Sequence, residues 1–219
     1  MTQCTFPDHL TRQLDQLASI SPVIPVLTID RLDDAVPLAT ALVDGGMPVL
    51  EVTLRTPCAL TAIEAIATLV PEAQVGAGTV TRPEQLRQIH QAGGHFAVSP
   101  GATPALLAAG CETELPLLPG VQTVSDIMLA LQAGYQRLKF FPAEAAGGRA
   151  TLNAFGGPFP ELRFCPTGGI NATNAKDYLA LPNVMCVGGT WLAPATLVNE
   201  KRWDDIRHLA ATAVETLTA

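Results

Sequence analysis

The chain has 219 residues, and its 20 acidic against 13 basic side chains give a formal net charge of −7 at neutral pH. Hydrophobic residues make up 48% of the chain and charged residues only 15%, which excludes a disordered protein and favours strands buried on both faces. The acidic balance, without any run of Lys or Arg, argues against a nucleic-acid-binding surface.

The apolar stretches are well short of the roughly 18 residues that a membrane span needs. The first ten residues also lack the basic and then apolar pattern of a secretion signal, so we expect a cytoplasmic protein.

The cysteines and histidines give no pattern of ligands or bridges. The histidines form no H-x-H or H-E-x-x-H pair, which argues against a metal-dependent mechanism. The cysteines form no C-x-x-C pair, and we interpret them as reduced thiols. They are Cys4, Cys58, Cys111, Cys165 and Cys186.

Short apolar runs alternate with helical patterns along the chain, which is typical of βα units around a parallel sheet. The expected strands are residues 23–27, 48–53, 74–79, 95–99, 115–118, 137–141, 162–167 and 184–188. The first four helices are expected at 32–43, 58–69, 83–92 and 104–109, each after a capping residue, and the last at 203–217.

These repeats predict an α/β protein, a (β/α)8 TIM barrel that forms a single domain over residues 1–219. Residues 7–20 are expected to form an extra N-terminal helix that closes the bottom of the barrel. The alternative is an open doubly wound sheet, which usually carries a glycine-rich phosphate loop after its first strand. The residues after the first strand, VLTID at 26–30, contain no such loop.

Glu51 is the first anomalous residue, because it lies inside an expected buried strand. The period of two places Glu51, Thr53 and Arg55 on one face and the apolar residues on the other. Since the apolar face should contact the helices, Glu51 should point into the barrel, where an unpaired carboxylate is costly. The alternative interpretation is a partner in a structural ion pair.

Lys139 is the second anomaly, in the sixth expected strand, RLKFFP at 137–142. It shares a face with Phe141 and should also point inward; the alternative is a lysine that extends along the exterior of the strand. The neutral amine of a desolvated lysine attacks ketones to form a Schiff base. Glu51 and Lys139 would then face one cavity from opposite strands, an arrangement suited to carbonyl chemistry in which the carboxylate moves protons.

Further polar or glycine-rich positions end the expected strands. Turns at Gly168-Gly169 and Gly188-Gly189 follow strands seven and eight, where barrels often bind phosphate through backbone N–H groups, although isolated Gly-Gly turns are weak evidence. Arg55 and Thr79 would clamp a carboxylate, or alternatively cap the helices that follow. Pro100 would line the cavity or belong to an ordinary turn.

Four segments resemble a known family: EVTLRT at 51–56, VGAGTV at 75–80, KFFPAE at 139–144 and RFCPTGGI at 163–170. They are similar to motifs of the bacterial 2-keto-3-deoxy-6-phosphogluconate (KDPG) aldolases, a family that includes 4-hydroxy-2-oxoglutarate aldolases. The resemblance covers nearly the whole chain. It implies a class I aldolase of the Entner–Doudoroff route, which cleaves KDPG to pyruvate and glyceraldehyde 3-phosphate. Cleavage of 4-hydroxy-2-oxoglutarate to pyruvate and glyoxylate would be a second activity.

The resemblance also implies roles for individual residues. Lys139 would be the Schiff-base lysine and Glu51 the general acid and base, so that the covalent imine replaces a cofactor. Arg55 and Thr79 would hold the pyruvyl carboxylate, Phe141 would pack beside the imine, and Thr167 would recognise the aldehyde portion. Pro100, at the end of the fourth expected strand, is counted with these substrate-binding residues as part of the cavity lining. The residues implied to hold the phosphate are Gly168, Gly169, Gly189 and Thr190, the last at a position where the family carries Ser or Thr. The family is typically a homotrimer.

Two rival functions use the same barrel. A phosphosugar isomerase or epimerase would use the phosphate turns but would leave Lys139 without a role. A non-catalytic sugar-phosphate binder would keep the pocket without turnover, although buried charges are costly to retain for binding alone. The residue types do not determine the preferred aldehyde portion, the stereoselectivity at C4 or a side activity such as oxaloacetate decarboxylation.

Overall fold

The computed structural model describes residues 5–218, so Cys4 lies outside the described residues. Its strands are β1 (Val23–Leu27), β2 (Val49–Thr53), β3 (Gln74–Gly78), β4 (Ala97–Val98), β5 (Leu117–Leu118), β6 (Gly120–Val121), β7 (Arg137–Phe140), β8 (Arg163–Pro166) and β9 (Val187–Gly189). Its α-helices are α1 (Asp8–Ile20), α2 (Ala35–Asp44), α3 (Ala59–Leu69), α4 (Pro83–Gln91), α5 (Pro104–Cys111), α6 (Val124–Gln132), α7 (Gly148–Phe155), α8 (Ala175–Leu179), α9 (Ala195–Asn199) and α10 (Trp203–Thr218), and the 3-10 helix η1 (Leu32–Asp34) precedes α2.

The parallel strands form a closed barrel. One sheet has the order β5-β4-β3-β2-β1-β9 and the other the order β6-β7-β8. Pro119 alone separates β5 from β6, so these two segments occupy one strand position of the barrel, here called a stave. Single bridges from Phe164 to Val184 and from Thr167 to Gly188 join the chain around β8 to the chain around β9. This closure confirms the predicted barrel, and the open doubly wound sheet is wrong.

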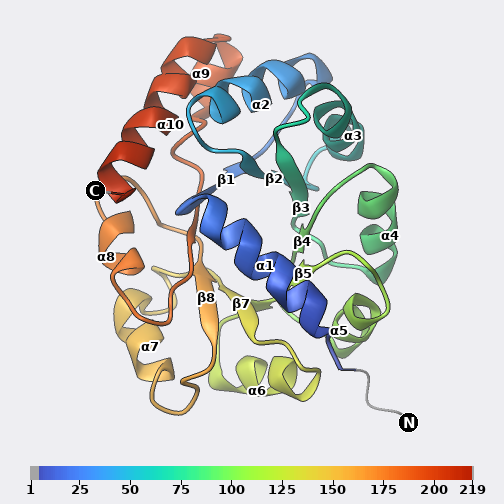
Figure 1. Ribbon diagram of the computed structural model, residues 1–219, viewed down its shortest axis with the longest axis vertical. Helices are drawn as coiled ribbons and strands as arrows, with labels where there is room; N and C mark the ends of the chain where they lie inside the picture. The colour runs from blue at the N-terminus through green and yellow to red at the C-terminus, as the bar shows by residue number, and fades with distance from the viewer. Residues whose placement is uncertain (1–4, 219) are drawn as a thin grey trace.

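Burial explains why the low-charge strands form the inner layer. All residues of β1 (VIPVL) and β2 (VLEVT) are buried, as expected for strands enclosed by helices on the outside and by side chains within. Figure 1 shows the strands at the centre of a ring of helices, with α10 beside α2 where the chain closes the ring.

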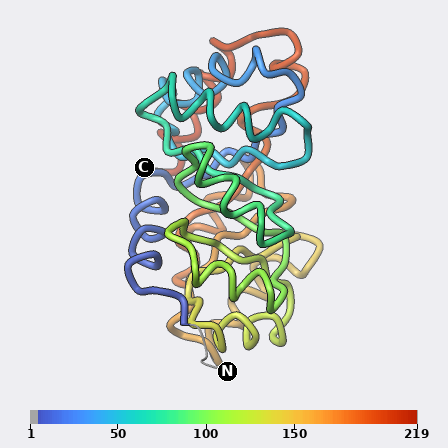
Figure 2. The backbone as a smooth tube through the Cα atoms, turned by 90° about the vertical axis from the view of Figure 1, so that its right-hand side faces the viewer, coloured from blue at the N-terminus to red at the C-terminus, as the bar shows by residue number. Residues whose placement is uncertain are grey.

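Helix α1 confirms the predicted N-terminal helix, beginning one residue later than expected. It buries Leu10, Leu14, Leu17 and Ala18, which lie on one face of a helix. Arg137, at the start of β7, donates a hydrogen bond through Nη2 to Oδ2 of Asp15 at 2.8 Å, which ties α1 to the barrel. In Figure 2 this helix lies along the outside of one end of the barrel.

Some predicted bounds differ from the structure. Strand β3 ends at Gly78 rather than Thr79, because Thr79 has φ of +60° and leaves the extended conformation. The fourth stave pairs only at residues 97–98, and the fifth continues past Pro119 to Val121. The expected helix 32–43 begins as η1, and the sequence pattern predicts no bounds for α6, α7, α8 or α9.

Two structural observations concern membrane proteins and metal-dependent enzymes, the classes that the sequence argues against. None of the helices described within residues 5–218 is long and apolar enough to cross a membrane. Over the same range, no group of three or more His, Cys, Asp or Glu side chains is arranged to hold a metal ion, and Cys58, Cys165 and Cys186 are free thiols.

Candidate active site

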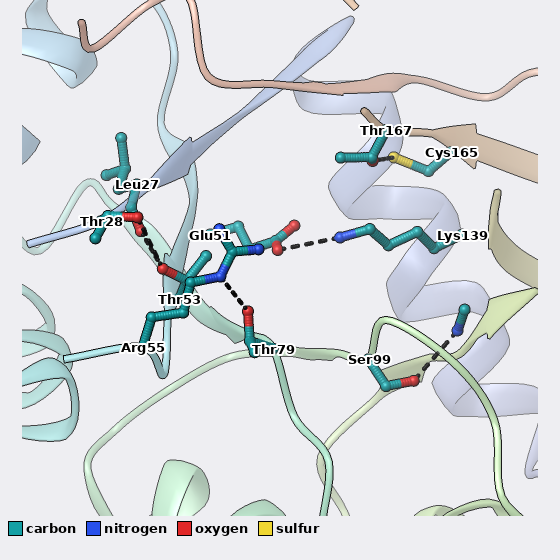
Figure 3. Close-up of polar contacts among 11 residues, drawn as sticks. Leu27, Thr28, Glu51, Thr53, Arg55, Thr79, Ser99, Lys139, Cys165 and Thr167 are labelled. Carbon is teal, nitrogen blue, oxygen red and sulfur yellow. Dashed lines mark hydrogen bonds and ion pairs between the residues drawn. The ribbon is translucent and has the colours of Figure 1, made fainter. Parts of the chain in front are cut away.

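The structure brings Glu51 and Lys139 together inside the barrel. Glu51 lies on β2 and Lys139 on β7, on opposite sides of the strand ring, and their exposed fractions are 3% and 5%. Lys139 Nζ donates a hydrogen bond to Glu51 Oε1 at 3.3 Å (Figure 3). The interpretation of Lys139 as an exterior lysine is therefore wrong. Glu51 does belong to an ion pair, and its partner is the other candidate residue.

Backbone pairing holds Lys139 in the middle of its stave. Its N–H donates to the carbonyl of Pro119 at 2.9 Å, and its neighbours in register are Gly120 on β6 and Cys165 on β8. The Phe141 ring lies two residues further on, with its centroid 5.3 Å from Nζ, within the range of a cation–π contact. The amine thus has a carboxylate on one side and an aromatic face on another.

The Cys186 thiol near the pair does not compete with Lys139 as a nucleophile. A hydrogen bond with Cys165, complete burial and the nearby Glu51 carboxylate together raise the pKa of the Cys186 thiol well above its usual value. Cys186 is therefore held as the neutral thiol, and the thiolate, not the thiol, is the nucleophilic form.

Arg55 and Thr79 meet at the ends of neighbouring strands. Arg55 Nε donates to Thr79 Oγ1 at 3.0 Å (Figure 3). The alternative that these residues cap helices is wrong, because Cys58 is the N-cap residue of α3 and Arg82 that of α4. The exposed guanidinium of Arg55 follows the end of β2, the strand that carries Glu51, and the half-buried Thr79 hydroxyl follows the end of its neighbour β3.

Pro100 packs near Lys139 through Gly120. A Cβ added to Gly120 would lie 2.4 Å from the carbonyl carbon of Pro100, and Gly120 pairs with Lys139 in register. Ser99 Oγ accepts a hydrogen bond from Gly120 N–H at 3.2 Å, which fixes this close approach. The segment after β4 is therefore part of the wall beside the lysine.

The two glycine turns lie next to each other at the ends of β8 and β9. Thr167, 5% exposed, bridges to Gly188, which places Gly168 and Gly169 beside Gly189 and Thr190. Gly168 and Gly169 have φ of +98° and +81°, a conformation that favours glycine. Within residues 5–218, the amide N–H groups of Gly168, Gly169 and Thr190 donate no hydrogen bond, as an anion site requires.

Sequence reasoning missed the side chains that hold the first of these turns. Asn174 Nδ2 donates to Gly169 O at 3.0 Å, and its Oδ1 accepts from Asn171 N–H at 2.9 Å. Glu144 N–H donates to Gly168 O at 3.1 Å. The asparagines follow the RFCPTGGI motif directly, so the signal was their spacing of three residues, which is typical of a local polar turn.

Glu144 and Tyr178 fill the space behind the same turn. A Cβ added to Gly169 would lie 2.5 Å from Glu144 Cγ, and the Tyr178 hydroxyl donates to Glu144 Oε1. Burial and this bond to Glu144 raise the pKa of Tyr178 well above its usual range, so the hydroxyl keeps its proton. The carbonyl oxygens of Gly168 and Gly169 thus already accept hydrogen bonds from within the protein.

An α/β barrel that buries a lysine against a glutamate has the make-up of a Schiff-base aldolase. Comparison with known proteins then identifies the family. The chain belongs to the KDPG and KHG aldolases, whose family model matches residues 14–209. This confirms the resemblance and the enzyme class, an aldehyde-lyase.

Curated relatives agree with this assignment. The KHG/KDPG aldolase of Escherichia coli K12 is 53% identical over 201 residues, which cover 92% of this chain and 94% of that protein. The 2-dehydro-3-deoxy-phosphogluconate aldolase of Dickeya dadantii is 53% identical over 205 residues, 94% of this chain and 96% of that protein.

Solved structures agree as well. The Legionella pneumophila KDPG aldolase, with pyruvate captured as a covalent carbinolamine intermediate, has a TM-score of 0.90 and 50% identity, covering 91% of this chain and 97% of that one. The Zymomonas mobilis ZM4 enzyme with 3-phosphoglycerate has a TM-score of 0.87 and 48% identity, covering 93% and 95%.

Proposed function

We propose that this aldolase cleaves 2-keto-3-deoxy-6-phosphogluconate to pyruvate and glyceraldehyde 3-phosphate through an imine on Lys139. The observation that carries the proposal is the buried pair of Lys139 and Glu51, with 3.3 Å between Nζ and Oε1. The carbinolamine of pyruvate captured in the L. pneumophila relative supports the same chemistry here. Cleavage of 4-hydroxy-2-oxoglutarate to pyruvate and glyoxylate is proposed as a second activity, since the E. coli relative is named for both substrates.

In the proposed mechanism, Lys139 Nζ attacks C2 of the keto acid, and loss of water leaves a cationic iminium. Glu51 takes the proton of the C4 hydroxyl while the C3–C4 bond breaks, and the bonding electrons pass to the iminium to form an enamine. The aldehyde leaves. Glu51 then returns the proton to C3, and water hydrolyses the imine to release pyruvate and restore the free amine.

The other residues are proposed to bind the substrate. Arg55 and Thr79 would hold the pyruvyl carboxylate, since a guanidinium pairs well with a carboxylate. Pro100 and Phe141 would pack beside the imine, and Thr167 would contact the aldehyde portion. The backbone of Gly168, Gly169, Gly189 and Thr190 would hold the phosphate.

We also propose that the enzyme is a cytoplasmic homotrimer, a single barrel domain per chain, with no resident metal and no cofactor beyond the covalent imine. The family resemblance supports the trimer. A phosphorylated sugar acid as substrate supports the location.

Two variants test the mechanism through the rate of pyruvate release from KDPG. Lys139→Ala should abolish cleavage and imine formation together. Glu51→Gln should still form the imine but cleave about 10²- to 10⁴-fold more slowly, the usual contribution of a general acid–base group. Lys201→Ala, an exposed lysine remote from the sequence motifs, is the matched control and should cleave at the wild-type rate. Near-normal cleavage by Lys139→Ala would contradict the proposal and favour the isomerase or the silent binder.

A further inference from the structure

The side chain of Glu51 lies directly over Gly78, the last residue of β3. A Cβ added to Gly78 would lie 2.0 Å from Glu51 Oε1 and 2.7 Å from both Cγ and Cδ. These are the three nearest atoms, and all belong to Glu51. Because real side chains do not approach so closely, the carboxylate occupies space that exists only because residue 78 has no side chain.

The backbone itself does not require glycine at this position. The φ of Gly78 lies outside the left-handed region, and the residue pairs with Thr53 in the regular register of β2 and β3. Gly76, on the same strand, differs: a Cβ there would lie 2.5 Å from the carbonyl oxygen of Phe96. The fold therefore needs glycine at 76, whereas at 78 the nearest obstacle is the Glu51 side chain.

Glu51 is buried, and one of its carboxylate oxygens contacts Lys139. The side chain is 4% exposed, and Oε1 lies 3.3 Å from Lys139 Nζ. A methyl group on residue 78 would have to push Oε1, Cδ and Cγ away together. Proton transfer depends on hydrogen-bond reach, and a misplacement of about 1 Å is enough to lower a catalytic rate about a hundredfold.

We propose that Gly78 is a positioning residue for proton transfer, which sets the location of the Glu51 carboxylate by leaving room for it beside Lys139. The inference rests on the proposed function, in which Glu51 moves the protons at C4 and C3. It assigns to the second glycine of VGAGTV a role in one chemical step and none in imine formation.

The test is Gly78→Ala, with two readouts that separate the steps. Pyruvate and sodium borohydride report imine formation, and exchange of the pyruvate methyl protons in D2O reports proton transfer by Glu51. We expect the rate of adduct formation to stay within about threefold of wild type and the exchange rate to fall at least about a hundredfold. Gly157→Ala is the matched control, because a Cβ there meets only an ordinary contact of 3.7 Å; both readouts should match wild type.

A double-mutant cycle shows whether the effect passes through Glu51. In a Glu51→Gln background, Gly78→Ala should lower the remaining exchange by no more than about threefold, since the group it displaces is already inactive. If Gly78→Ala unfolds the protein, the double variant Glu51→Ala/Gly78→Ala should fold and be as thermally stable as the single variant Glu51→Ala. This is expected because the clash of the added methyl group is with the Glu51 side chain.

Three results would overturn the inference: exchange by Gly78→Ala within about threefold of wild type, a further hundredfold loss in the Glu51→Gln background, or a double variant that stays unfolded. These outcomes leave the proposed function intact if wild type forms the adduct and Glu51→Gln alone loses exchange. Failure of the proposed function has a different signature, namely no adduct in wild type or full exchange by Glu51→Gln.

Discussion

Thr79 shows how a single residue at this site combines backbone strain with a useful hydroxyl. A β-branched residue at φ of +60° is unusual, and such conformations cost about 1–3 kcal/mol each. The conformation directs Oγ1 to accept the hydrogen bond from Arg55 Nε at 3.0 Å. The strain is therefore coupled to the orientation of the guanidinium that we propose binds the substrate carboxylate.

This coupling predicts opposite effects on stability and binding. Thr79→Gly should raise the free energy of unfolding by about 1 kcal/mol, because glycine adopts positive φ without strain. It should also raise the KM for KDPG about threefold to tenfold, because the acceptor for Arg55 is lost. Thr79→Ser keeps the hydroxyl and should keep the wild-type KM. Thermal unfolding and steady-state kinetics measure both effects, and a Thr79→Gly variant that is less stable with unchanged KM would contradict the explanation.

For single residues, the sequence predicts the roles of buried charged side chains better than the role of a glycine that leaves space for a neighbour. Glu51 and Lys139 stand out because a charge within an apolar strand is rare, and the period of two already points both inward. Nothing in the pattern reveals the φ of Thr79 or the fit of Gly78 under Glu51, because both depend on neighbouring strands. The role of a glycine as a gap appears only when the surrounding atoms are placed.

Among the elements, the turn between β8 and α8 connects sequence and binding most directly. Its carbonyls accept hydrogen bonds from the Asn174 side chain and the Glu144 N–H, while, within residues 5–218, the N–H groups of Gly168 and Gly169 donate none. Asn174 is also the N-cap residue of α8, so one side chain lies at the junction of the helix and the turn.

Loss of this brace should weaken phosphate recognition selectively. We expect Asn174→Ala to lower kcat/KM for KDPG about threefold to tenfold, the equivalent of one hydrogen bond of 0.5–1.5 kcal/mol. The value for 4-hydroxy-2-oxoglutarate, which has no phosphate, should not change and serves as the internal control. Equal losses on both substrates would indicate a general structural role and contradict the prediction.

The bounds of helices and strands were predictable only where residues such as proline mark them in the sequence. Helices α4 and α5 begin with proline after Arg82 and Thr103, so their starts are visible in the sequence. The fifth stave is divided by Pro119, which has no N–H to donate but whose carbonyl accepts from Lys139 N–H. A proline normally ends a predicted strand, so the continuation to Val121 depends on the pairing with β7.

For the whole molecule, one stave connects the two ends of the barrel. Arg137, at the start of β7, pairs with Asp15 of α1, while Lys139 two residues later faces Glu51 and Phe141 follows beyond the strand end. The contact with the N-terminal helix thus lies at the start of β7, and the candidate active site lies toward its carboxyl end, as in other barrels. The repeat of apolar strands predicts this architecture, whereas the closure of β8 on β9 through single bridges is a property of the assembled fold.

The central claim is that Lys139 is the residue that binds the keto acid covalently. The chain has three lysines, and the other two, Lys176 and Lys201, are exposed. The direct measurement is incubation with pyruvate and sodium borohydride, followed by digestion and mass spectrometry of the lysine peptides. We predict one reduced pyruvyl adduct, on Lys139, formed in parallel with loss of KDPG cleavage. An unmodified Lys139 in folded, active protein, or an adduct confined to Lys176 or Lys201, would contradict the account.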